Sequence, residues 1–145
     1  MQITRYTDYS LRVLIYLAVH PDQLCTIQNI ADAYKISKNH LMKIVQELNL
    51  QGYVTAVRGK HGGVTLNKKP HEINVGALVR LMERDSKLLE CFSENNHCVI
   101  TPSCRLKGAF VQALESFYSC LDSYHLSDFL NVDVNQSLQA LLVRS

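Results

Sequence analysis

The chain has 145 residues, of which 47% are hydrophobic and 19% are charged. This length fits one domain, or a small domain with an appendage, and the composition excludes a disordered chain. The longest apolar run, Val13–Val19, is far shorter than the ~20 residues that a membrane-spanning helix needs. The first ten residues are polar and do not resemble a secretory signal. We therefore expect a cytoplasmic protein with no membrane partner.

The first predicted helix spans Tyr9–Val19, where apolar residues recur at helical spacing. Thr7 or Asp8 is expected to cap its start, and the pair His20-Pro21 ends it. This helix is expected to support the elements that follow.

A helix-turn-helix is predicted next. A short helix follows Thr26, a turn covers residues 34–36, and Ser37 caps a longer helix that ends at Gly52. A short helix, a turn and a longer helix in this order are typical of the helix-turn-helix.

The hydrophobic period changes to two after this helix, which predicts β-structure. Residues 53–57 and 64–66 are expected to form two strands, joined by the basic, glycine-rich tip 58–63. Three helices followed by such a hairpin make a winged helix-turn-helix. The expected fold class is therefore mainly α with a small β-hairpin wing.

A long helix is predicted in the second half of the chain. Asn74 caps a fourth helix first, and residues 85–100 then show no sustained period. Thr101-Pro102 is a strong helix start, and the helix is expected to continue to Tyr124, over roughly 30 Å or more. Its apolar stripe comprises Leu106, Phe110, Ala113, Leu114, Phe117, Leu121 and Tyr124.

One small domain can hardly bury so long a stripe, whereas a second copy of the helix could. We therefore expect a dimerisation helix and a homodimer; packing across its own domain is the alternative. The predicted division is a winged helix-turn-helix domain at 1–80, a cysteine-containing cluster-binding loop at 81–104, and the dimerisation helix with a C-terminal segment at 102–145.

The basic residues are concentrated in the first half of the chain. Residues 1–80 carry ten Lys and Arg against five Asp and Glu, a balance of +5, and residues 81–145 carry five against eight, a balance of −3. Such a basic block is typical of a surface that binds the phosphates of nucleic acid.

The predicted contacts to double-stranded DNA lie on two elements. The N-terminal end of the third helix enters the major groove first in helix-turn-helix proteins, and the wing tip can reach a phosphate or the minor groove. The candidate DNA-binding residues are Lys38, Asn39, His40 and Lys43 on the helix, and Arg58, Lys60 and His61 on the wing.

Three of the five cysteines, Cys91, Cys98 and Cys104, fall within fourteen residues. Their odd total and the absence of a secretion signal argue against a disulfide framework. The gaps of six and five residues are wider than the short chelate typical of structural zinc. From spacing alone an iron–sulfur cluster is favoured, with zinc and a thiol switch as alternatives. Plausible additional donors are His97, Glu90, Glu94 and Asp8.

Cysteine position adds two further expectations. Cys104 is expected in the first turn of the long helix, where the helix dipole would stabilise a thiolate. Cys25 and Cys120 are expected to be small buried hydrophobic residues rather than ligands.

The chain resembles the Rrf2 family of winged-helix regulators. The resemblance rests on the stretch from Thr7 to Leu14, on Gly52-Tyr53-Val54, and on the wing tip from Arg58 to Gly63. The segment from Ile100 to Lys107 resembles the nitric-oxide-sensing members of that family.

The resemblance implies a homodimeric repressor that binds a pseudo-palindromic operator with an iron–sulfur cluster in place. Nitric oxide would attack the cluster, release the DNA and derepress genes that detoxify nitric oxide. The implied ligands are Cys91, Cys98 and Cys104, with Asp8 of the partner subunit as the fourth. A 4Fe-4S cluster is favoured over a 2Fe-2S cluster.

Two departures from the family are visible. The gap between Cys91 and Cys98 is slightly wider than the family pattern. Lys107 stands where the branch that regulates iron–sulfur biogenesis has a histidine. The alternatives are a regulator of this fold that senses redox state, iron or iron–sulfur supply, and a small iron–sulfur electron carrier. No catalytic constellation is present, so we do not expect an enzyme.

Overall fold

The computed structural model describes residues 1–143. Its helices are α1 (Arg5–Ala18), α2 (Ile27–Tyr34), α3 (Lys38–Leu50), α4 (Val75–Met82), α5 (Leu106–Asp122) and α6 (Val132–Val143), and its two strands are β1 (Val54–Val57) and β2 (Gly63–Leu66). Short 3₁₀ turns lie at Pro70–Glu72, Glu90–Phe92, Thr101–Ser103 and Leu126–Phe129. The fold class is the predicted one, a mainly helical chain with a β-hairpin wing.

Helix α1 begins earlier than the apolar pattern predicts. Thr4 is the N-cap, and its side chain accepts a hydrogen bond from the backbone N–H of Thr7. The prediction of Thr7 or Asp8 as the cap was therefore wrong, because the first turn of α1 is polar and carries no apolar period. Thr7 is buried and Asp8 is half-buried, both within the helix.

The helix-turn-helix follows the sequence signals closely. Thr26 and Asn29 form a reciprocal capping box at the start of α2. Lys35 takes a left-handed conformation, with φ 56°, in the turn. Ser37 then caps α3 by accepting from the backbone N–H of His40. Gly52, with φ 80°, ends the helix in a conformation that glycine adopts without strain.

The wing is an antiparallel hairpin in which Val54 pairs with Leu66 and Val57 with Gly63. Cys25 adds a short bridge to this hairpin: its backbone N–H donates to the Val64 carbonyl at 3.1 Å, and the Val64 N–H donates back at 2.6 Å. The bridge fixes the base of the wing to the segment that precedes α2.

The core lies where α1, α2, α3 and the hairpin meet, with α4 closing one side. Its largest fully buried side chains include Leu14, Leu17, Ile30, Leu41, Ile44, Leu48, Ile73 and Leu78. Except for Ile73, which follows the 3₁₀ turn Pro70–Glu72, these residues lie on helices at positions that fit the apolar helical spacing of the sequence. Their burial leaves the N-terminal end of α3 and the wing tip at the surface.

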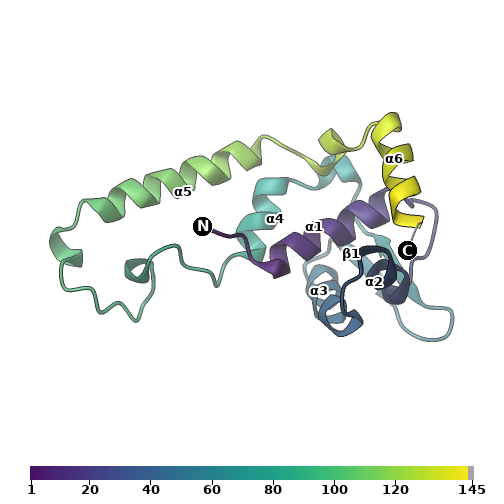
Figure 1. The fold of residues 1–145 in the computed structure, drawn as a ribbon, viewed down its shortest axis with the longest axis horizontal. Coiled ribbons are helices and arrows are strands. Elements are labelled where there is room, and N and C mark those ends of the chain that lie inside the picture. Colours follow the sequence, from purple (N-terminus) through teal and green to yellow (C-terminus); the bar gives the residue numbers. More distant parts are fainter. Residues whose placement is uncertain (144–145) are drawn as a thin grey trace.

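Helix α5 projects away from this core, and its N-terminal end is remote from every other helix (Figure 1). None of its residues is buried. It is 17 residues long, which is about 26 Å, and it starts four residues later than predicted and ends two residues before Tyr124.

The C-terminal segment contains a helix, α6, that the sequence pattern did not predict. The side-chain amide of Gln139 donates to the Val19 carbonyl at 2.6 Å, and Leu142 joins the core cluster. The chain therefore returns to the end of α1 after α5 (Figure 1). Within the described residues, none of the helices is both long and apolar enough to cross a membrane.

Candidate DNA-binding surface and cysteine segment

The N-terminal end of α3 presents polar side chains to solvent. Lys38, Asn39 and Lys43 are exposed, whereas Leu41 and Ile44 on the opposite face are fully buried. The buried face fixes the rotation of α3, so the exposed residues point away from the core together. Such an edge can enter a major groove, in which an Asn side chain pairs with adenine and a Lys side chain with guanine or phosphate.

His40 has a different environment from its neighbours on α3. Its ring is half-buried and lies edge-on to the ring of Tyr9, with 5.0 Å between centroids. Tyr9 belongs to α1. His40 therefore links α3 to α1, a contact that sequence spacing alone does not reveal.

The wing tip is basic and open. Arg58, Lys60 and His61 are all exposed, and Gly59 has φ 107°. The backbone N–H of Gly62 donates to the Gly59 carbonyl at 3.0 Å, which closes the turn. The tip thus holds its three basic side chains on a short, tightly turned loop.

Asp8 forms a bidentate ion pair with Arg12 one turn further along α1. Both guanidinium contacts measure 3.0 Å. Both side chains are about half exposed, so the pair contributes about 0.3–0.5 kcal/mol. Arg12 also lies over the ring of Tyr9, at 5.3 Å, and near that of Tyr34, at 5.8 Å.

Tyr34 orders the same part of α1. Its hydroxyl donates to the Arg12 carbonyl at 2.8 Å. Burial raises the pKa of Tyr34 to about 12, although the nearby positive charge of Arg12 lowers that pKa to a smaller extent. The phenol therefore stays protonated and keeps this hydrogen bond at physiological pH.

The cysteine segment, defined here as residues 85–104, joins α4 to α5. It contains no buried residue. Its hydrogen bonds are largely internal: the Asn96 amide donates to the Thr101 hydroxyl, which donates to the Cys98 carbonyl, and the Glu90 carboxylate accepts from the backbone N–H of His97. The segment therefore has no hydrophobic core of its own.

The three cysteines of this segment are free thiols. Cys91 and Cys104 are half-buried and Cys98 is exposed. No group of three potential ligands is close enough to share a metal ion in the part of the chain that the structure describes. The donor chemistry fits an iron–sulfur cluster, which takes thiolates, but this structure does not bring the thiols together.

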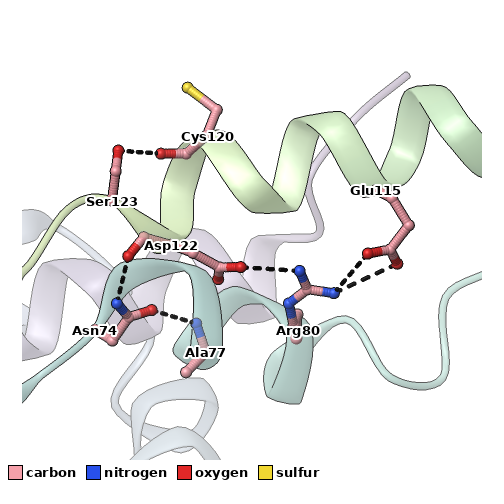
Figure 2. A network of polar contacts seen from close by, with 7 residues as sticks. All are labelled: Asn74, Ala77, Arg80, Glu115, Cys120, Asp122 and Ser123. Carbon is pink, nitrogen blue, oxygen red and sulfur yellow. Dashed lines mark hydrogen bonds and ion pairs between the residues drawn. The ribbon is translucent and has the colours of Figure 1, made fainter.

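Two predictions about cysteine position were wrong. Cys104 does not lie in the first turn of α5: it follows a 3₁₀ turn with extended backbone, and Arg105 is the N-cap. Thr101-Pro102 starts that 3₁₀ turn rather than the long helix. Cys120 is exposed on α5 rather than buried, and its sulfur points away from α4 (Figure 2). Cys25 is buried, as expected.

A polar network fixes the angle between α4 and α5 (Figure 2). Arg80 on α4 pairs with Asp122 at 3.0 Å and with Glu115 at 3.4 Å, and its guanidinium lies 4.5 Å from the centroid of the Tyr118 ring. The Asn74 amide donates to the Asp122 carbonyl at 2.7 Å. These residues could not be predicted from the sequence, because pairs 35 to 48 positions apart leave no local signal.

Comparison with known proteins gives consistent results. The family model Rrf2, described as an iron-dependent transcriptional regulator, matches residues 3–132. The HTH-type transcriptional regulator NsrR of Bacillus licheniformis is 49% identical over 132 residues, which cover 90% of this chain and 92% of that protein. The protein of the same name from Halalkalibacterium halodurans is 46% identical, with 98% and 97% covered.

A solved structure extends the comparison to the fold. The oxidized form of Staphylococcus aureus CymR superposes with a TM-score of 0.67 and is 26% identical, covering 87% of this chain and 93% of that one. The full-length relatives above are named as transcriptional regulators, which agrees with the expectation of a regulator rather than an enzyme.

Proposed function

Because the chain belongs to the Rrf2 family of transcriptional regulators, we propose that it is a homodimeric repressor of operator DNA whose cysteine segment binds an iron–sulfur cluster and senses nitric oxide. The observation that carries the proposal is the combination of an exposed basic α3 edge and wing with three free thiols in one coreless segment. The regulators named NsrR, 45–49% identical to this chain, support the same function.

For DNA binding, we assign the base contacts to the exposed α3 edge and the backbone contacts to the wing. Asn39 and Lys43 face solvent without a partner element over them, and Lys60 lies at the wing tip. His40 lies on the same α3 edge, and its ring also packs on Tyr9 of α1. Two copies of this surface on one dimer would read a pseudo-palindromic site.

For the dimer, the support comes from α5. Phe110, Leu114 and Phe117 line a hollow with Met1 and Leu88, and none of these residues is buried. Most of the stability of a helix in a protein comes from packing along its apolar face rather than from its intrinsic helix propensity. A second copy of α5 would cover that face, as the apolar stripe in the sequence predicts.

For the cluster, the residues that would hold it are Cys91, Cys98 and Cys104, with Asp8 of the partner subunit as the fourth donor. When bound, the cluster supplies iron that reacts with nitric oxide. A carboxylate is a harder and weaker iron ligand than a thiolate. To serve as the fourth donor, Asp8 has to give up its weak ion pair with Arg12, whose two side chains are both about half exposed.

The direct test of the cluster assignment is the iron and sulfide content of anaerobically purified variants. Alanine at Cys91, Cys98 or Cys104 should abolish bound iron. The controls Cys25→Ser and Cys120→Ser should keep it. Full iron in the Cys98→Ala variant would contradict the assignment, and zinc or no metal in the wild-type protein would favour a structural-metal or thiol-switch regulator instead.

A further inference from the structure

Two consecutive residues, Glu83 and Arg84, connect the end of α4 to two different helices of the DNA-binding half. They directly follow α4 and directly precede the cysteine segment. Glu83 reaches the start of α1, and Arg84 reaches α3.

Glu83 holds the N-terminal end of α1. Glu83 is 7% exposed. One oxygen of its carboxylate, Oε1, accepts from the Thr4 backbone N–H at 2.8 Å, the Thr4 hydroxyl at 2.9 Å and the Thr7 hydroxyl at 2.7 Å. These are charge-assisted hydrogen bonds, which are stronger than neutral ones. The start of α1 is therefore fixed to the end of α4.

Arg84 holds the recognition helix. Its guanidinium forms an ion pair with Glu47 of α3, with 3.0 Å between Nη2 and Oε1, and Nη1 donates to the Leu81 carbonyl at 3.0 Å. Glu47 is only 16% exposed, whereas Arg84 is 47% exposed. The Gln51 amide donates to the same Glu47 oxygen. The pair thus joins the C-terminal half of α3 to the residue directly before the cysteine segment.

We propose that Glu83 and Arg84 are positioning residues, through which the state of the cysteine segment sets the orientation of α1 and α3 on DNA. This rests on the proposed function, because it assumes that the segment responds to a signal. When residues 85–104 become ordered or disordered, the backbone of Arg84 is displaced first, because Arg84 is covalently bonded to that segment. Arg84 transmits the displacement to Glu47 across a 3.0 Å contact.

The test measures whether DNA binding becomes tighter or weaker when the charge of Glu47 or of Arg84 is removed. Removing the acid Glu47 from a DNA-binding helix should tighten DNA binding if only long-range charge matters. The positioning role predicts the opposite, because Glu47→Gln releases Arg84. We expect Glu47→Gln and Arg84→Gln each to weaken binding by about 3- to 30-fold, with little further loss in the double variant.

The duplex probe is the sequence that full-length wild-type protein selects from a random pool, with a scrambled duplex as reference. Lys87→Gln is the matched control for the loss of one positive charge. Lys87 lies within the cysteine segment and forms no ion pair within the described residues. Its ammonium donates to the Arg84 backbone carbonyl at a long 3.4 Å, a contact that does not involve the Arg84 guanidinium. The charge-swapped variant Glu47→Arg with Arg84→Glu should recover at least part of the lost affinity. Thermal melting of each variant confirms that it is folded.

A second arm measures the coupling to the cysteine segment. We expect the ratio of operator affinities before and after removal of iron to shrink towards one in Arg84→Gln and to stay at the wild-type value in Lys87→Gln. Tighter binding by Glu47→Gln, or an unchanged ratio in Arg84→Gln, would overturn the positioning role. A wild-type protein that selects no duplex, or that binds equally with and without iron, would overturn the proposed function itself.

Discussion

Glu83 is a buried carboxylate whose pKa is set by two opposing causes. Burial raises the pKa, but hydrogen bonds from Thr7, the Thr4 backbone, Ser86 and the Thr4 hydroxyl together lower it below the ordinary value of 4.5. The unfolded chain therefore binds this proton at a higher pH than the folded chain. The stability from Glu83 is fully present above about pH 4.5 and is lost as the pH falls through the lower folded pKa.

Replacing Glu83 by Gln should make the protein less stable at pH 7 and should reduce its further loss of stability below pH 4.5. Urea unfolding at a series of pH values between neutral and acid measures both effects. The exposed Glu94 offers the control, and Glu94→Gln should follow the wild-type curve. A Glu83→Gln variant with the full wild-type acid dependence would mean that these hydrogen bonds do not favour the charged form of Glu83.

Asn39 and Lys60 are predicted to act on DNA in different ways. Asn39→Ala should cost ~1–3 kcal/mol on the selected operator and relax the preference at one base position, because a base contact is lost. Lys60→Ala should weaken binding to all DNA sequences alike and reduce the salt dependence of the binding affinity, because a phosphate contact is lost. Titrations of operator and scrambled duplexes at several salt concentrations separate the two. An unchanged operator affinity in Asn39→Ala would contradict the assignment of base recognition to α3.

At the scale of elements, α4 and α5 cross at Gly76. A Cβ at this position would meet Asp122: it would lie 2.6 Å from the backbone nitrogen and 2.8 Å from Cα, and it would also clash with the carboxylate. Because the obstacle is backbone, α5 has to move, and Gly76→Ala should destabilise the protein by about 1–3 kcal/mol. Gly108→Ala on α5 is the control, since nothing lies within 4 Å, and helix propensity makes it neutral or stabilising by up to about 1 kcal/mol. Equal melting temperatures for the two variants would contradict the crossing.

Local signals predicted the elements up to α4. The caps Ser37 and Asn74 and the change of period after Gly52 act within a few residues, so the sequence alone contains them. The start of α5 was placed too early because Thr101-Pro102 fits a 3₁₀ turn as well as a helix. Helix α6 was missed because few of its apolar residues face the core; of its side chains only Leu142 is buried.

The residues of the candidate site likewise divide into those that local sequence signals predict and those that depend on contacts distant in the sequence. Spacing and composition identified the basic α3 edge and the three thiols, which are local features. The hydrogen bonds of Glu83 could not be predicted, because its partners Thr4 and Thr7 lie 79 and 76 positions away. The burial of Glu83 arises only in the folded chain. The proposed ligation by Asp8 involves a second subunit, which one sequence does not describe.

At the scale of the whole molecule, the apolar face of α5 is the predicted subunit interface. Phe110→Asp puts a charge into that face, and burying an unpaired carboxylate there is prohibitive. We expect this variant to be monomeric at micromolar concentration in light scattering, with weaker operator binding. Gln112→Asp adds the same charge on the exposed opposite side of α5 and should remain dimeric. A dimeric Phe110→Asp variant would place the interface elsewhere.

The most direct test of the central claim follows visible absorption and operator binding in one anaerobic titration with nitric oxide. We predict iron–sulfur absorption in the starting protein, and DNA release that tracks the loss of that absorption. Cys98→Ala is predicted to lack both the absorption and the response. Operator binding that persists after the absorption is gone, or a wild-type protein that contains no iron and still loses DNA on nitric oxide addition, would contradict it.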